Sequence, residues 1–493
     1  MNPRLIVIGM GGFSSSLILP WIYKGWLPNI EYLISRGKSG EINSNFPLCW
    51  TSEWASLLTG MEPSYTGYFD SISKRSGSYF PEITNLSSLH HNGIWNRSSE
   101  FKKIQTALIN IPNLHPFPKM PTINHGPLNV LFNFPSEVEK IKKVFPSRKK
   151  NLTFNNRSDK TQLNSVELIQ QEIEEVILQG NLYAGLLKST KSQLIVGHFY
   201  GPSRILSRFW EYVEALIPQK SNTKLTLIHE NIILFFKVLD DVIGRVLETI
   251  HSNDMLLLFS GHGYGPLQKI ININEFLNDL GLFSYKDLKE KDKILNNYIS
   301  PLLRKFGVRR NVAKKIIDPW GGIYLTNLLD RVALPFSSEI GFVDWLNTKA
   351  FSISRKGIHL NVYGHEALGT VKSSSEFRNI GELIIRELLS LSDPFSGRRI
   401  FYDVKWRDEI YEGPQLKNLP HLIFNSWDQT FQIANLYQNK SNPTIFSNPV
   451  ERTGTEIKDG FFVTYGFDPS IYFNSETLSL LDLSTLIFKN INK

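Results

Sequence analysis

Short apolar runs alternate with longer amphipathic stretches along the chain, and this alternation predicts an α/β protein. The runs at 4–10, 192–200 and 254–260 (RLIVIGM, SQLIVGHFY and DMLLLFS) consist mainly of apolar residues, as buried strands do. Helical patterns follow at 27–37 and 228–250, and the first of them stops at a glycine. Strand, glycine turn and helix in this order predict a doubly wound, mostly parallel sheet with helices on both faces.

Two segments of different composition interrupt this alternation. Residues 101–190 are rich in Asn, Pro, Lys and Ser before they turn helical, and residues 285–342 contain a basic helical stretch. We interpret 101–190 as an insertion or cap and 285–342 as a basic helical insertion. The α/β core is then expected in three parts, at 1–100, 191–284 and 343–493.

Composition supports a compact protein with a sizeable core. The chain has 493 residues, of which 41% are hydrophobic and 20% are charged, which argues against wholesale disorder. The net charge of +8 is concentrated in basic runs at 140–150 and 304–315. Such runs attract phosphates, nucleic acid or anionic membranes, but no nucleic-acid-binding module accompanies them. We therefore interpret them as solvated faces of the insertions.

The number of cysteines and the lengths of the apolar stretches indicate the cellular location. The single cysteine, Cys49, excludes an internal disulfide and is interpreted as a small buried apolar residue. The apolar N-terminus is interrupted by GMGG, unlike a signal peptide, and no stretch reaches membrane-spanning length without charges. These features predict a soluble, cytoplasmic protein.

Several sequence blocks, in order from the first strand to the C-terminus, carry a family resemblance. They are VIGMGG and LCWTSEWASLLTG near the start, then SGHGYGPLQKIININEFLNDLGLF, VDWLNTKAFSISRKGIHLNVYGHEALGTV, DPFSGRRIFYDVKWRDEIYEGPQL and GTEIKDGFFVTYGF. Together they resemble the type I phosphodiesterase and nucleotide pyrophosphatase family of the alkaline phosphatase superfamily. The resemblance implies the doubly wound fold of that superfamily, with the two insertions added.

The chemistry of the family depends on residues that this sequence has largely exchanged. Members hold two divalent cations, usually zinc, with aspartates and histidines, and a threonine or serine attacks phosphorus. Of these residues, only the histidine of the family's SDHG turn, which reads SGHG here, keeps its residue type. The resemblance places the ligand and nucleophile positions on Gly11, Trp50, Ser203, Ser207, Gly261, His262 and Glu456.

This exchange implies a catalytically degenerate, pseudoenzyme-like protein for which no metal cofactor is expected. Glycine and serine do not hold a divalent cation with useful affinity. The former metal cleft would instead bind an anionic or phosphorylated small molecule, or a protein partner whose identity the sequence leaves open. Trp50 would fill the volume of the metals or stack on a ligand ring. Hydrogen bonds would come from Ser203, Ser207 and the amides of the turns that contain Gly11, Gly12 and Gly261.

Two alternatives keep catalysis. In the first, the cleft performs metal-free chemistry, with His262 as general acid or base, Glu456 as its orienting or second carboxylate and Thr51 as a displaced nucleophile. Against this, a lone histidine is as often a turn residue bonded to nearby backbone. In the second, the protein is an active metal-dependent phosphodiesterase with relocated ligands. These would come from Asp70, His198, His359, His365, Glu366 and His421.

Overall fold

The computed structural model divides the chain into two compact units, which are described separately. The first unit comprises Met1–Ser71, Thr84–Gln268 and Pro449–Lys493, and the second comprises Ile72–Ile83 and Lys269–Asn448. The residues that the structure describes are 3–43, 50–74, 77–79, 81–86, 93–94, 105–114, 122–125, 128–132, 162–189, 192–217, 225–286, 343–434, 444–467 and 477–491.

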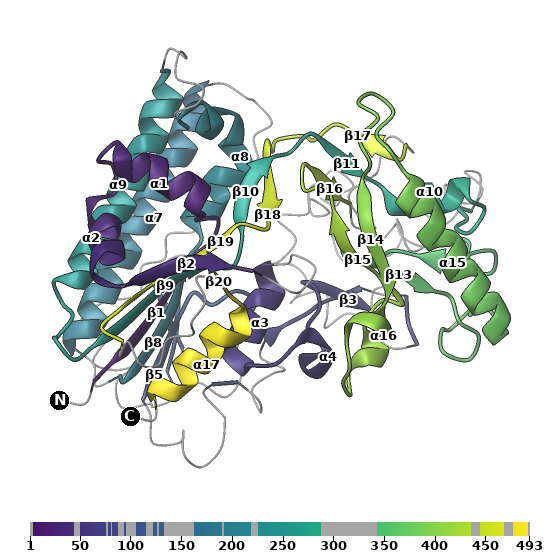
Figure 1. Cartoon of the computed structure of the whole chain (residues 1–493), viewed down its shortest axis with the longest axis horizontal. Helices are drawn as coiled ribbons and strands as arrows, with labels where there is room; N and C mark the ends of the chain where they lie inside the picture. The colour runs from purple at the N-terminus through teal and green to yellow at the C-terminus, as the bar shows by residue number, and fades with distance from the viewer. Residues whose placement is uncertain are drawn as a thin grey trace, which may run out of the picture. The chain divides into compact units, whose positions relative to one another are not determined.

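A central mixed sheet organises the first unit (Figure 1), in the order β20-β2-β19-β9-β1-β8-β5-β7-β6 within the described part of the chain. The neighbours β9, β1, β8 and β5 run parallel, which confirms the predicted parallel core. The other strands join antiparallel partners, except that β20 runs parallel to β2. The bounds are β1 (Leu5–Met10), β2 (Lys38–Ile42), β5 (Thr106–Ile109), β6 (Thr122–His125), β7 (Leu128–Phe132), β8 (Leu194–Phe199), β9 (Met255–Ser260), β19 (Gly460–Tyr465) and β20 (Thr477–Leu478).

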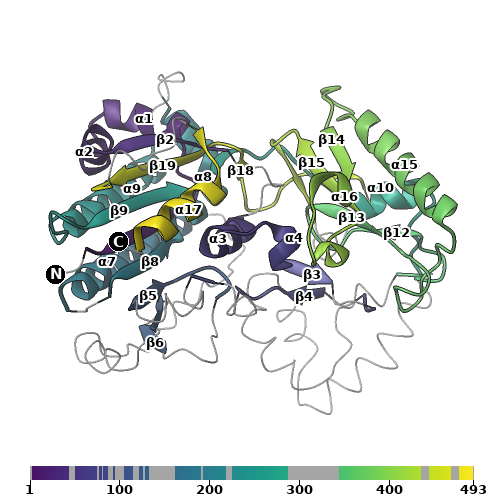
Figure 2. The same cartoon turned by 60° about the horizontal axis from the view of Figure 1, so that its bottom comes forward.

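Helices cover both faces of this sheet, as the fully apolar strands predict. Alternate residues of β1 point to opposite faces, so Ile6 and Ile8 pack in one apolar cluster while Leu5 and Val7 pack in the other. Figure 2 shows α7 and α9 on one face and α3 and α17 on the other. The first layer comprises α1 (Ser15–Tyr23), α2 (Pro28–Arg36), α7 (Gln162–Ser189), α8 (Gly201–Ala215) and α9 (Leu227–Leu247), and the second α3 (Trp50–Thr59) and α17 (Leu480–Ile491).

The predicted helices at 27–37 and 228–250 are confirmed as α2 and α9. Helix α2 ends at Gly37, where a Cβ atom would lie 1.7 Å from the carbonyl oxygen of Thr464. Glycine is therefore required by the close approach of the helix end to β19. No helix in the described ranges combines the length and apolar character needed to cross a membrane.

The structure divides the chain differently from the boundaries drawn on sequence. Strand β5 and helix α7 lie within 101–190, the segment interpreted as an insertion, yet β5 pairs with β8 and α7 packs along α9. A four-residue strand between polar segments has too little periodicity to reveal its place in a core. Most of 343–493, expected as core, belongs to the second unit. The basic runs, Cys49 and nearly all of 285–342 lie outside the described residues.

The second unit contains an antiparallel sheet in the order β12-β13-β15-β14, flanked by the helices α10 and α15. The hairpin β3-β4 of this unit is formed by the short segment Ile72–Ile83. Tyr79 of this segment stacks on Trp345, with 3.6 Å between the ring centroids. The Tyr79 hydroxyl also donates to Asn361 Oδ1. The bounds are β3 (Ile72–Lys74), β4 (Pro81–Ile83), α10 (Ile273–Asp279), β12 (Ala350–Phe351), β13 (Gly357–Leu360), α15 (Ser374–Ser390), β14 (Phe401–Trp406) and β15 (Leu422–Trp427).

Candidate functional site

The two glycine turns that contain the predicted site residues lie side by side at the carboxyl edge of the parallel strands. Strands β1 and β9 are neighbours, so the turns that follow them meet. The Ser260 hydroxyl joins these turns, because it accepts from the Gly12 amide at 2.8 Å and donates to the His262 carbonyl at 2.6 Å. Gly12 and Gly263 also form a parallel bridge. The tertiary structure thus brings Gly11, Gly12, Gly261 and His262 together.

Ser203 fills the space beside Gly11. It lies in the first turn of α8, which begins directly after β8 with Pro202 in that turn. A Cβ atom on Gly11 would lie 2.1 Å from Ser203 Oγ, so the serine hydroxyl occupies the position that any larger residue at 11 would need. Ser207 follows one turn later on the same helix face and is half-buried like Ser203. The two serines therefore lie at the same strand edge as the glycine turns.

A buried carboxylate from α3 contacts the site histidine. Glu53 Oε2 accepts from His262 Nδ1 at 2.9 Å, and the side chains are only 4% and 5% exposed. Its other oxygen, Oε1, is buried and has no hydrogen-bond partner in the part of the chain that the structure describes. A Cβ atom on Gly261 would lie 2.3 Å from Glu53 Oε2. Glycine stands before His262 because the Glu53 carboxylate occupies the adjacent space.

Glu53 is the site residue that sequence reasoning missed. It lies three residues after Trp50 in the first turn of α3, and 209 positions separate it from His262. A single glutamate in a helix is ordinarily interpreted as a solvated side chain. The signal that the sequence offered was its position inside the block LCWTSEWASLLTG, three residues after the expected nucleophile position Trp50. The burial that gives Glu53 its importance arises from tertiary packing alone.

His198 lies beside this pair as a neutral ring. Its Nδ1 donates to the Gly9 carbonyl at 3.2 Å, and the indole of Trp54 contacts it edge-on at 5.3 Å between ring centroids. Burial, with a smaller contribution from nearby His262, lowers the pKa of His198 to about 3. His198 thus contributes an uncharged packing surface rather than a charge to the site.

The arginine that follows Ser203 is paired with two carboxylates. Arg204 donates to Glu172 at 3.0 Å and to Glu175 at 2.9 Å, both of which lie on α7 and are buried. Arg204 therefore supplies no uncompensated positive charge to the site, because the carboxyl groups of Glu172 and Glu175 both face its guanidinium group. Burial raises the pKa of Glu172 to about 7, while the charge of Arg204 acts in the opposite direction.

The raised pKa of Glu172 predicts a pH effect on stability. A carboxyl group whose pKa rises on folding stabilises the fold below its unfolded value of 4.5, and this contribution is lost as the pH rises through about 7. The variant Glu172→Gln, which stays neutral, should therefore be more stable than wild type at pH 8 by about 1–3 kcal/mol. Its advantage should vanish at pH 5 in urea unfolding. Glu174→Gln, an exposed change on the same helix, is the matched control.

The structure gives few side-chain contacts for three other predicted site residues, Glu456, Trp50 and Thr51. Glu456 lies in β18 (Gly454–Ile457), opposite Tyr264 of β10 (Gly263–Pro266), and is half-buried. Within the described ranges its carboxylate has no hydrogen bond or ion pair, and the carboxylate that bonds to His262 is that of Glu53. Trp50 and Thr51 begin α3, but their side chains lie outside the described part of the structure.

The relocated ligands considered for an active metal enzyme are divided between the two units. His198 and Asp70 belong to the first unit. In the second, Glu366 pairs with Lys74 at 2.7 Å, and His421 Nδ1 accepts from the Leu360 amide. Among the residues that the structure describes, no three histidine, cysteine or acidic side chains are grouped in a way that could hold a metal ion.

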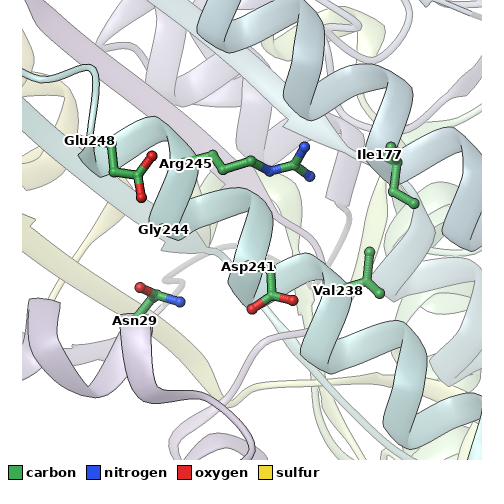
Figure 3. A pocket seen from close by; sticks show the side chains of 7 residues that line it. All are labelled: Asn29, Ile177, Val238, Asp241, Gly244, Arg245 and Glu248. Carbon is green, nitrogen blue, oxygen red and sulfur yellow. The ribbon is translucent and has the colours of Figure 1, made fainter.

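A separate surface hollow of about 510 Å³ lies on the helical layer of the first unit (Figure 3). It follows one side of α9 and shares no residue with the strand-edge site. Acidic and basic side chains both line it, so it presents no single charge to a ligand. The lining residues are Asn29, Ile177, Val238, Asp241, Gly244, Arg245 and Glu248.

The fold and the strand-edge site define an α/β protein with a candidate site at the carboxyl edge of its parallel strands. The model of the type I phosphodiesterase / nucleotide pyrophosphatase family matches residues 5–318, and the chain belongs to this family. The phosphonoacetate hydrolase of Sinorhizobium meliloti 1021, solved with phosphonoacetate, is similar in fold at a TM-score of 0.51 and 10% identity, over 99% of this chain and 96% of that one. The same enzyme with phosphonoformate gives 0.49, also at 10% identity and with the same coverage. No curated protein matches the sequence significantly.

Membership in this family raises the question of whether two metal ions fit here. Gly11 and Gly261 have no donor atoms in their side chains, and their Cβ positions are filled by the Ser203 hydroxyl and the Glu53 carboxylate. His262 uses Nδ1 for Glu53. Among the described side chains that meet at these turns, Glu53 and His262 are too few to match the aspartate and histidine set of the family. The described donors at this edge therefore do not fit a two-metal centre.

Proposed function

We propose that this protein works without the two-metal centre of its family and uses the strand-edge site to bind an anionic, phosphoryl-bearing small molecule. The observation that carries the proposal is the refilling of the ligand positions. Ser203 Oγ lies 2.1 Å from the Cβ position of Gly11, and Glu53 Oε2 lies 2.3 Å from that of Gly261. A site that had only lost its aspartates would contain empty space, whereas this one is rebuilt with residues that exclude them.

The residues that remain supply hydrogen-bond donors suited to phosphoryl oxygens. Because Glu53 holds Nδ1, His262 would act on a ligand through Nε2, and as an imidazolium it would donate a charge-assisted hydrogen bond. The hydroxyls of Ser203 and Ser207 would donate from the first two turns of α8. These donors recognise oxygens without a cation, and this supports the binding of a phosphorylated ligand.

A second candidate function is metal-free acid–base chemistry at the same site. The bond between Glu53 and His262 favours it, because a carboxylate on Nδ1 orients the ring and stabilises its protonated form. In this form of the hypothesis Glu53, rather than Glu456, is the orienting carboxylate. Retained ligand binding with lost turnover in His262→Ala would distinguish catalysis from binding alone.

Metal analysis and a phosphate titration test the proposed function together. We expect elemental analysis of the full chain, purified without chelator, to find less than a tenth of an equivalent of zinc or manganese. Calorimetric titration with inorganic phosphate should give saturable binding that His262→Ala weakens about tenfold or more, since a hydrogen bond to a charged group is lost. His251→Ala, which removes an exposed histidine of the same unit, is the control. One or two equivalents of metal, or equal phosphate affinity in both variants, would contradict the proposal.

A further inference from the structure

We propose that Glu53 replaces the aspartate that the family carries at position 261 and acts as the positioning residue of His262. In the family turn this aspartate directly precedes the histidine, and here Gly261 stands in its place. The carboxylate would thus have moved from the turn after β9 to the first turn of α3, while its place beside the histidine is kept.

The distances around Gly261 carry this inference. From the Cβ position of Gly261, the Glu53 carboxylate carbon lies 2.5 Å away and its two oxygens lie 2.3 and 3.1 Å away. In aspartate the carboxylate carbon is bonded directly to Cβ, about 1.5 Å from it. Glu53 therefore delivers its carboxylate to nearly the place that an aspartate side chain would occupy. An aspartate carboxylate at 261 and the Glu53 carboxylate would exclude each other sterically, so the glutamate at 53 requires glycine at 261.

The contact with His262 gives this carboxylate a specific role. A carboxylate that accepts from Nδ1 at 2.9 Å fixes the tautomer and the orientation of the ring, and Nε2 is then the nitrogen that does not bond to Glu53. It also favours the protonated ring, because an opposite charge lies within hydrogen-bond distance. Among the described titratable groups near His262 are Tyr264 from β10, whose ring centroid lies 5.8 Å from that of His262, and His198 from β8, a neutral ring close enough for His262 to lower its pKa.

One carboxylate oxygen of Glu53 argues against a purely structural role. Within the described ranges Oε1 is buried and has no hydrogen-bond partner, and an unsatisfied buried acceptor costs about 1–3 kcal/mol. Glutamine or an apolar residue would pack here without a buried charge. A buried carboxylate beside a histidine is typical of a functional site. The use of the Glu53–His262 pair for phosphoryl recognition rests on the proposed function, whereas the geometry of the pair is independent of it.

The test follows the His262 ring in the full chain by its ¹⁵N chemical shifts as a function of pH, with assignment by the His262→Ala variant. In Glu53→Gln the titration midpoint of His262 should fall by about one pH unit or more, because the charge is lost while the size is kept. In the double variant Glu53→Ala/Gly261→Asp it should return toward the wild-type value. Ser56→Ala, a buried change on the same helix, should leave it unmoved.

Each outcome is decisive. An unchanged midpoint and tautomer in Glu53→Gln would overturn the inference, and so would an equal shift in Ser56→Ala. If the double variant does not fold, Glu53→Gln decides alone. If His262 titrates as expected while wild type does not bind inorganic phosphate, the proposed function fails and the positioning role of Glu53 stands.

Discussion

Replacing Gly261 by aspartate, the residue of the family, should destabilise the protein by about 3 kcal/mol or more rather than rebuild a metal site. The new Cβ atom would lie 2.3 Å from Glu53 Oε2, so Glu53 would have to leave its place. Its bond to His262 would break, and two carboxylates would share a buried space that offers one imidazole. Because such carboxylates cannot both ionise easily, the loss should be larger at pH 8 than at pH 5. Denaturant unfolding of Gly261→Asp and wild type at the two pH values measures it.

The matched control for this variant is the double change Glu53→Ala/Gly261→Asp. It keeps the new aspartate but removes the carboxylate with which the aspartate collides, so most of the lost stability should return. A Gly261→Asp variant as stable as wild type would contradict the packing around Glu53. Equal instability of the single and double variants would place the strain in the turn backbone instead.

Replacing Asp254 by asparagine should cost about 3–5 kcal/mol, because it leaves a buried arginine without its counter-charge. The Asp254 carboxylate accepts from the Arg4 backbone amide and Nε, both at 2.9 Å, and the two side chains are only 3% and 10% exposed. This pair joins the starts of β1 and β9, the two strands that position the glycine turns. Urea unfolding at pH 7 measures the loss.

The pH dependence gives this prediction a second readout. Burial alone would raise the pKa of Asp254, but hydrogen bonds from Arg4 and the His251 amide lower it below the unfolded value of 3.8. Its stabilising contribution is therefore present above pH 3.8 and is lost as the pH falls through the lower folded value. The difference between wild type and Asp254→Asn should shrink in acid. The exposed change Asp241→Asn should stay within about 0.5 kcal/mol of wild type.

Family and fold could be predicted from the sequence because they depend on local patterns. The apolar runs that became β1, β8 and β9 are fully buried strands, and such runs are legible without knowledge of their neighbours. The sequence did not reveal β5, because its four residues are too few to establish the hydrophobic period of a strand. The two-unit division was missed because the excursion at 72–83 joins the second unit through contacts with residues about 280 positions away.

The sequence by itself determined the parallel strands β1, β8 and β9, the helices α2 and α9, the family resemblance and the exchange of the ligand residues, including the glycine before His262. These are properties of residue type and spacing. Only the tertiary structure decided that this glycine is matched by Glu53, and that Arg204 is neutralised by Glu172 and Glu175. The physical reason is that a buried charge depends on partners that folding brings from distant positions, and no local pattern records them.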